Sequence, residues 1–312
     1  MKPLSQAVDD YLALRRGMGF KVRKYGICLH EFVSFMEGKG AQRMTSKLAL
    51  EYATQRSHEK PWSHAMRLNI VRGFARYRSN DDPATEVPAL KLLPFKSRRA
   101  RPYLYSQDEI RRLLKAARNI VIRSEFLPHM YPCFFGLLAV TGMRLGEAIN
   151  LQPQDVDWRQ GVLTLRNAKF GRTRLVPLRR STLRALREYA ELRDSVHRGR
   201  SLPYFFVSSR GVRLQEHTVS EVFRKLCRQI GIRQVGSRHG PRLHDLRHRF
   251  AVESLLRWYR RSPEEITKKL PVLSTYLGHV NISGTYWYLS NTPELMTAAS
   301  ALLEARWKGV AQ

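Results

Sequence analysis

Cysteine, acidic side chains and long apolar runs are all scarce in this sequence. The three cysteines, Cys28, Cys133 and Cys227, lie far apart without metal-ligand spacing, so we expect buried free thiols in a reducing cytosol. The longest apolar run, residues 131–140, is too short to span a bilayer and predicts a core helix. The first residues lack the apolar core of a signal peptide, so we expect a cytoplasmic protein without membrane contact.

The sequence also lacks the motifs that hold nucleotides or metal ions. It has no P-loop and no GxGxxG segment, which argues against a nucleotide cofactor. No cluster of carboxylates is evident of the kind that holds the metal ions of many nucleases. We therefore expect neither a cofactor nor a metal site.

Positive charge is what the sequence has in excess. It contains 55 lysines and arginines against 26 acidic residues, a net charge of +29, and its pI is near 10.7. A protein with this balance has a polyanionic partner, most simply nucleic acid. Charge alone also fits a ribosomal protein, a nonspecific DNA-coating protein or an arginine-rich genome. The hydrophobic fraction of 43% is enough to build a buried core.

The chain of 312 residues is long enough for about two domains. Residues 1–92 contain four segments with apolar residues at helical spacing, which predicts a helical bundle. Residues 93–105 are basic and contain two prolines, which indicates a linker, although a solvated loop has the same composition. Residues 106–312 form the second expected domain.

Helical patterns dominate the second domain, with one β interruption. It begins with a capping box, Ser106 with Glu109. Two β-rich runs around a short turn predict a hairpin over residues 161–178, and residues 204–209 predict another short strand. The fold class is therefore mainly α with a small β-sheet.

Three short segments hold charged side chains in patterns that fit a phosphate site. Gly142 is expected to end the apolar helix, Arg144 comes near the start of the next helix, and Glu147 follows on the same face, where it could orient the arginine. Lys169 lies by the tip of the expected hairpin, where it could enter a DNA groove. His244 and Arg247 are three residues apart, which puts a titratable histidine beside a permanent cation, while His248 and Arg249 are expected to point elsewhere. Each pattern alone also fits an ordinary ion pair or a solvated side chain.

Residues 276–290 add a histidine after a glycine, His279, and two tyrosines, Tyr286 and Tyr288. Two tyrosines two residues apart cannot share a helical face, so at most one points into a given site. Aromatic residues on a helix more often belong to a core, and this segment alone does not identify a nucleophile.

The order and spacing of these segments resemble the tyrosine recombinase (phage integrase) family. The motifs cover residues 106–290: Arg-x-x-Glu, a lysine 25 residues after that arginine, His-x-x-Arg, Leu-Gly-His, and a tyrosine nine residues after the last histidine. That last spacing selects Tyr288, and Glu147 matches the supporting acid. The catalytic roles of the family carry over onto Arg144, Lys169, His244, Arg247, His279 and Tyr288. The long gap between Arg247 and His279 and the unusual Trp287 leave the subfamily open.

The resemblance implies a reaction in which Tyr288 attacks a DNA phosphate. Arg144 and Arg247 would clamp that phosphate, because fixed positive groups stabilise its developing charge. The phenol, with an ordinary pKa of ~10, needs a base, for which His244 is the candidate, while His279 binds the same oxygens. Lys169 would protonate the leaving 5′ hydroxyl. The product is a 3′-phosphotyrosine link, formed without ATP or metal.

The resemblance also implies the partners. Two domains would close on double-stranded DNA as a C-shaped clamp: a core-binding domain over residues 1–92 with a SAM-like helical bundle, and an α+β catalytic domain. A homo-tetramer would act on two duplexes, with accessory or sister recombinases as further partners. A helix expected over residues 293–309 would dock on a neighbouring subunit or pack on its own domain.

The function implied is site-specific recombination that integrates, excises or transposes a mobile element. One alternative is a type IB topoisomerase-like enzyme, which has the same phosphotyrosine chemistry but relaxes a single duplex. The other is a DNA-binding regulator on a recombinase scaffold, which would be marked by a lost catalytic residue.

Overall fold

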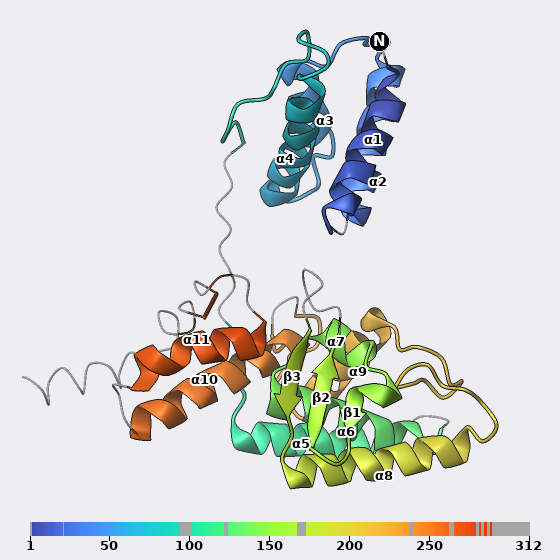
Figure 1. The fold of residues 1–312 in the computed structure, drawn as a ribbon, viewed down its shortest axis with the longest axis vertical. Helices are drawn as coiled ribbons and strands as arrows, with labels where there is room; N and C mark the ends of the chain where they lie inside the picture. The colour runs from blue at the N-terminus through green and yellow to red at the C-terminus, as the bar shows by residue number, and fades with distance from the viewer. Residues whose placement is uncertain are drawn as a thin grey trace, which may run out of the picture. The chain divides into compact units, whose positions relative to one another are not determined.

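The chain forms two compact units, Met1–Ala100 and Arg101–Gln312 (Figure 1). The computed structural model describes residues 2–20, 22–93, 102–121, 124–166, 173–237, 240–261, 265–278, 281, 284, 285 and 288. None of the helices described in these ranges is long and apolar enough to cross a membrane. Each unit has its own hydrophobic core.

The first unit contains the four helices that the sequence predicts. They are α1 (Leu4–Gly17), α2 (Arg23–Gly38), α3 (Ser46–Thr54) and α4 (Pro61–Arg78). The side chain of Thr45 caps α3 by accepting a hydrogen bond from the Leu48 amide, and Pro61 opens α4. The apolar faces meet around Phe32, Tyr52 and Phe74, which are fully buried.

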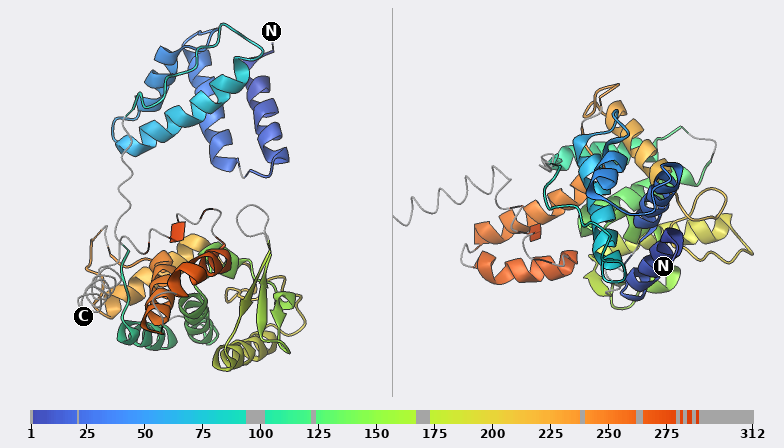
Figure 2. Two further views of the ribbon diagram at one scale, coloured as in Figure 1. Left: turned by 60° about the vertical axis from the view of Figure 1, so that its left-hand side comes forward. Right: turned by 90° about the horizontal axis from the view of Figure 1, so that it is seen from above.

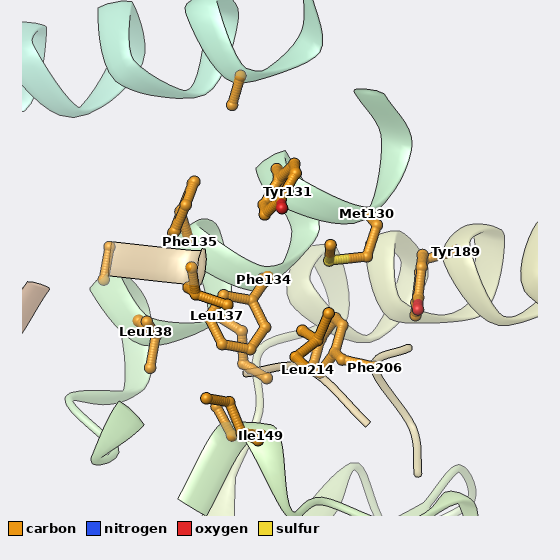
Figure 3. Close-up of a cluster of buried hydrophobic side chains, with 14 of the residues drawn as sticks. Met130, Tyr131, Phe134, Phe135, Leu137, Leu138, Ile149, Tyr189, Phe206 and Leu214 are labelled. Carbon is orange, nitrogen blue, oxygen red and sulfur yellow. The ribbon is translucent and has the colours of Figure 1, made fainter. Parts of the chain in front are cut away.

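The second unit is built around one apolar helix. Its helices are α5 (Gln107–Arg118), α6 (Leu127–Thr141), α7 (Leu145–Ile149), a 3-10 turn (Pro153–Asp155), α8 (Arg180–Val196), α9 (Glu216–Gln229), α10 (Leu243–Arg261) and α11 (Glu265–Leu277). The capping box Ser106–Glu109 at the start of α5 is confirmed. The apolar run at 131–140 lies in α6 and is largely buried, as its composition predicts. Figure 3 shows Phe134, Phe135 and Leu138 of α6 in this core.

The predicted hairpin is present and belongs to a three-stranded antiparallel sheet in the order β1 (Val156–Asp157), β2 (Val162–Leu165), β3 (Arg174–Pro177). Leu163 faces Val176 in the register, and both side chains are buried. The strand predicted at 204–209 is wrong, because only an isolated bridge joins Val207 to Arg213. Phe205 and its neighbours are aromatic because they fill the core, not because they pair in a ladder.

Helices α10 and α11 lie side by side (Figure 2). Helix α10 also contacts α6, and Phe250 on α10 packs beside Tyr276 on α11 with a ring distance of 5.4 Å. A separate apolar cluster forms between α10 and α11, and it includes Leu255, Leu273 and Tyr288. This packing brings the ends of α6, α7, β3 and α11 close to the first turns of α10.

The cysteines are free thiols where the structure describes them. Cys28 and Cys227 are buried as expected, whereas Cys133 is only partly buried. The prediction of three buried thiols is therefore wrong for Cys133, which lies on α6 and places its sulfur near the carbonyl of Ala185.

Candidate active site

Arg144 is held at the turn between α6 and α7. Gly142 ends α6 with φ of +61°, as its place after the apolar run predicts, and Arg144 follows as the N-cap of α7. A Cβ on Gly142 would lie 2.6 Å from a ring carbon of Phe250, so glycine is required both for this backbone conformation and for the contact with α10. The turn therefore fixes Arg144 against the α10 side of the unit.

The guanidinium of Arg144 has two fixed partners. Its Nη1 donates to Oε1 of Glu147 at 2.8 Å, and its backbone amide donates to Oε2 at 2.7 Å. Its Nη2 donates to the carbonyl oxygen of Gly278 at 2.7 Å, across 134 residues of sequence. Glu147 thus orients Arg144, as the spacing predicts. The side chain of Arg144 is 25% exposed, so it remains accessible to an incoming anion.

Arg247 lies deeper, on α10, and is 2% exposed. It donates to the carbonyl oxygens of Gly142 at 2.8 Å and Leu277 at 2.5 Å, and it has no carboxylate partner among the described residues. Burial and the positive charge of Arg144 lower the pKa of Arg247 to about 10, so it stays charged at neutral pH. A buried guanidinium without a carboxylate is unusual, because burial of an unpaired charge is costly.

The two arginines converge on the turn at the end of α11, since neighbouring carbonyls, those of Leu277 and Gly278, accept from Arg247 and Arg144. A third arginine that sequence reasoning missed joins them. Arg174 on β3 forms a two-pronged ion pair with Glu147, with distances of 2.8 and 2.7 Å. Arg144 and Arg174 therefore share one carboxylate, while Arg247 contacts carbonyl oxygens, and the site keeps an excess of positive charge.

Glu147 is ionised despite its burial. Burial alone opposes ionisation, but the hydrogen bonds and charge of Arg174, together with those of Arg144, outweigh it and hold the pKa of the carboxyl below its usual value. The carboxylate is thus a permanent negative centre, and it neutralises only part of the charge around it.

The imidazole of His244 is uncharged at neutral pH. Burial and the nearby charge of Arg247 lower its pKa, so the imidazole is neutral at pH 7. Its ring lies 4.7 Å from that of His248, one helical turn later, in an edge-to-face contact. The sequence interpretation that His248 points away from this face is wrong, and the i, i+4 spacing was the available signal.

Tyr288 lies next to this histidine pair. Its ring is 5.4 Å from the ring of His248 and is 3% exposed, within the cluster between α10 and α11. Tyr288 also interacts electrostatically with Arg247. Lys169, His279 and Tyr286, like the helix expected at 293–309, lie outside the described residues. The structure therefore brings together Arg144, Glu147, His244, Arg247 and Tyr288.

The part of the chain that the structure describes contains no group of three or more histidine, cysteine, aspartate or glutamate side chains placed to hold a metal ion. The described polar groups instead form a cationic cluster with a neutral imidazole and a phenol, which suits an anionic substrate that undergoes proton transfer.

The fold is that of tyrosine recombinases. The chain is similar to the Tn1549 transposon integrase solved with transposon right end DNA, with a TM-score of 0.68, 14% identity and coverage of 97% of this chain and 99% of that one. It is also similar to the XerH site-specific recombinase bound to a palindromic difH substrate, with a TM-score of 0.67, 17% identity and coverage of 96% and 85%.

Sequence relationships define the family. The model of the phage integrase family matches residues 104–294, so the chain belongs to this family of tyrosine recombinases, enzymes that break and rejoin DNA. It is 46% identical to the putative integrase/recombinase y4rB of Sinorhizobium fredii, over 99% of both chains. It is 25% identical to tyrosine recombinase XerA of Thermococcus onnurineus, over 96% of this chain and 95% of that one.

Proposed function

We propose that the protein is a site-specific recombinase that cuts each DNA strand through a covalent 3′-phosphotyrosine at Tyr288 and serves a mobile element. One observation carries the proposal: Arg144 and Arg247 are fixed on adjacent carbonyls, and among the described residues Glu147 is the one carboxylate that bonds to either of them, beside a neutral His244 and the ring of Tyr288. A phosphodiester supplies the negative charge that this arrangement lacks.

The residues divide the reaction among them. Arg144 and Arg247 bind the non-bridging oxygens of the scissile phosphate, where charge increases as the phenol oxygen attacks phosphorus. His244, whose pKa is lowered, takes the phenolic proton. Lys169 donates a proton to the leaving 5′ oxygen, and His279 binds the same phosphate oxygens as the arginines. The phosphotyrosine bond then replaces the broken phosphodiester, so rejoining needs no ATP.

The assembly is part of the same proposal. Residues 1–92 and 106–312, joined by the basic linker 93–105, would grip double-stranded DNA from two sides in the cytoplasm. Four copies would act on two duplexes, with the helix at 293–309 in contact with a neighbour and with sister or accessory recombinases as further partners. A lambda integrase tetramer bound to a Holliday junction has the same fold, with a TM-score of 0.58.

The role in a mobile element is supported by the relatives. The y4rB protein is described as a putative integrase/recombinase, and the similar Tn1549 structure is a transposon integrase on transposon end DNA. A type IB topoisomerase-like activity is the alternative, and it would relax one supercoiled duplex without pairing two sites. A regulator that only binds DNA is the other, yet all six expected catalytic residues are present.

The test is covalent trapping on a nicked suicide duplex that carries the junction sequence of the element. In excess EDTA, the wild-type protein should form an adduct, Tyr288→Phe should form none, and both should bind the duplex equally. Mass spectrometry of the adduct identifies the nucleophile. An adduct at Tyr286, or a requirement for a divalent ion, would contradict the assignment. Two further assays separate the recombinase from the topoisomerase: a recombinase exchanges strands between two paired sites, whereas a topoisomerase relaxes a single supercoiled duplex.

A further inference from the structure

Arg174 is the charged residue of the site that none of the catalytic roles uses. It lies on β3, its side chain is 9% exposed, and Glu147 is its ion-pair partner. Its Nε is buried and has no hydrogen-bond partner among the described residues. The guanidinium therefore directs its two terminal nitrogens at one carboxylate, which fixes the position of that carboxylate.

Each carboxylate oxygen of Glu147 accepts one hydrogen bond from Arg144 and one from Arg174. Its Oε1 accepts from Nη1 of Arg144 and Nη1 of Arg174, each at 2.8 Å, and its Oε2 accepts from the Arg144 amide and Nη2 of Arg174, each at 2.7 Å. Four donors saturate the carboxylate. Because Arg174 occupies one side of it, Glu147 can bind Arg144 through only one terminal nitrogen, which leaves Nη2 of Arg144 directed at Gly278.

The charge balance leads to the same conclusion. Arg144 and Glu147 alone would form a neutral pair, in which the carboxylate draws the guanidinium into a two-pronged bridge. Arg174 adds a second cation to the same carboxylate, so the group of three keeps one positive charge. That remaining charge is available to a phosphate at Arg144.

Arg174 also borders the turn that carries the other contacts. Gly278 has φ of +64°, and a Cβ there would lie only 2.7 Å from Nη1 of Arg174. The carbonyl of the same glycine accepts from Arg144. Arg174 thus lies behind the arginine that faces the substrate and against the backbone that orients it.

We propose that Arg174 is a positioning residue for cleavage: through Glu147 it holds Arg144 in the geometry, and with the net charge, that the scissile phosphate requires. The inference rests on the proposed function, because it assumes that Arg144 binds that phosphate. The role that it assigns to Arg174 on β3 is distinct from the one proposed for Lys169.

The experiment measures single-turnover cleavage of the suicide duplex by Arg174→Gln and Arg174→Lys. We expect Arg174→Gln to cleave about 10- to 100-fold more slowly, by analogy with the loss of an outer hydrogen-bond partner of a metal ligand, with DNA affinity unchanged. Arg174→Lys should recover only part of the rate, because an ammonium keeps the charge but cannot form the fork. Arg193→Gln is the matched control, since Arg193 is also buried and ion-paired but lies on α8.

A sulfur-containing substrate separates the role of Arg174 from acid catalysis by Lys169. If the 5′ bridging oxygen is replaced by sulfur, the leaving thiol, with an ordinary pKa of ~8.5, departs without an acid. Lys169→Ala should then be rescued, whereas Arg174→Gln should stay slow, as Arg144→Gln does. Rescue of Arg174→Gln would overturn the inference, because it would mean that Arg174 only places the hairpin.

A double-mutant cycle tests the route through Glu147. If Arg174 acts through that carboxylate, Arg174→Gln should slow cleavage much less in a Glu147→Gln background than in the wild type. Additive losses would contradict the route. A wild-type rate for Arg174→Gln overturns the inference alone, whereas a wild-type protein that forms no adduct overturns the proposed function and the inference with it.

Discussion

Gly278→Ala tests how closely the arginines must fit the turn at the end of α11. The backbone of Gly278 has φ of +64°, and the added methyl carbon would lie 2.7 Å from Nη1 of Arg174 and 3.4 Å from Nη1 of Arg144. Any side chain in this conformation costs about 1–2 kcal/mol. Ordinary contact requires roughly 3.5 Å, so the Arg174 guanidinium must retreat by several tenths of an ångström and weaken its bonds to Glu147.

The chain offers a matched control for the backbone cost. Gly231 follows α9 with φ of +76°, and a Cβ there would meet nothing within 4 Å. Gly231→Ala therefore has the conformational penalty without the clash, and both variants should lower the midpoint of urea unfolding. Only Gly278→Ala should slow cleavage, by about 10- to 100-fold, since a displacement near 1 Å at a catalytic group costs on the order of 100-fold.

Single-turnover cleavage of the suicide duplex measures this difference. The penalty of Gly278→Ala should shrink when Arg174 is shortened to alanine, because the obstructing guanidinium is then gone. Equal cleavage rates for Gly278→Ala and Gly231→Ala would refute the reasoning, since they would show that the arginines tolerate displacement. An undiminished penalty in the Arg174→Ala background would show that strain in the turn, and not the arginine contact, limits the rate.

Three further predictions concern Arg247, His244 and the salt dependence of DNA affinity. Arg247→Ala should slow cleavage at least ~100-fold but leave affinity nearly intact in a filter-binding assay, and an equal loss of affinity would contradict this. Because the pKa of His244 is lowered, the cleavage rate should not change with pH near 7 and should fall only below pH ~6.5, where the imidazole becomes protonated. The free energy of unfolding, measured in urea, should also lose the contribution of His244 only below that pH, because the unfolded chain then binds the proton more readily. The slope of log affinity against log salt should be near −9 if roughly ten phosphates are neutralised, and smaller for residues 106–312 alone; an unchanged slope would argue against a two-domain grip.

Local sequence signals were sufficient where the contacts are local. Gly142, Arg144 and Glu147 lie within six residues, so helix-end rules and the i, i+3 spacing predicted the turn, the N-terminal arginine and its acid. The capping box of Ser106 and Glu109 is of the same kind. These predictions succeeded because the partners are fixed by the backbone of one helix end, which the sequence specifies directly.

Contacts between residues far apart in the sequence could not be predicted in the same way. Arg174 sits in a strand where an arginine fits a solvated hairpin equally well, and its partner Glu147 is 27 residues earlier. Only the packing of β3 against α7 and the end of α11 brings them together. His248 is a different case, because its spacing from His244 was visible, and the mistake was to treat the histidine after Arg247 as outward-facing. The run at 204–209 has the composition of a strand because Phe205 and Phe206 fill the core.

The first turns of α10 explain why two histidines, two arginines and only one acid occur in residues 243–250. The acid, Asp245, is fully buried and accepts from the backbone and guanidinium of Arg242, so it anchors the start of the helix and does not neutralise Arg247. Arg249 donates to the carbonyl of Tyr105 and the side chain of Gln107, which ties α10 to α5. Arg247 alone is left with carbonyl partners and no carboxylate among the described residues. Under the proposed function the scissile phosphate balances this charge, which would account for the excess of positive charge in this segment.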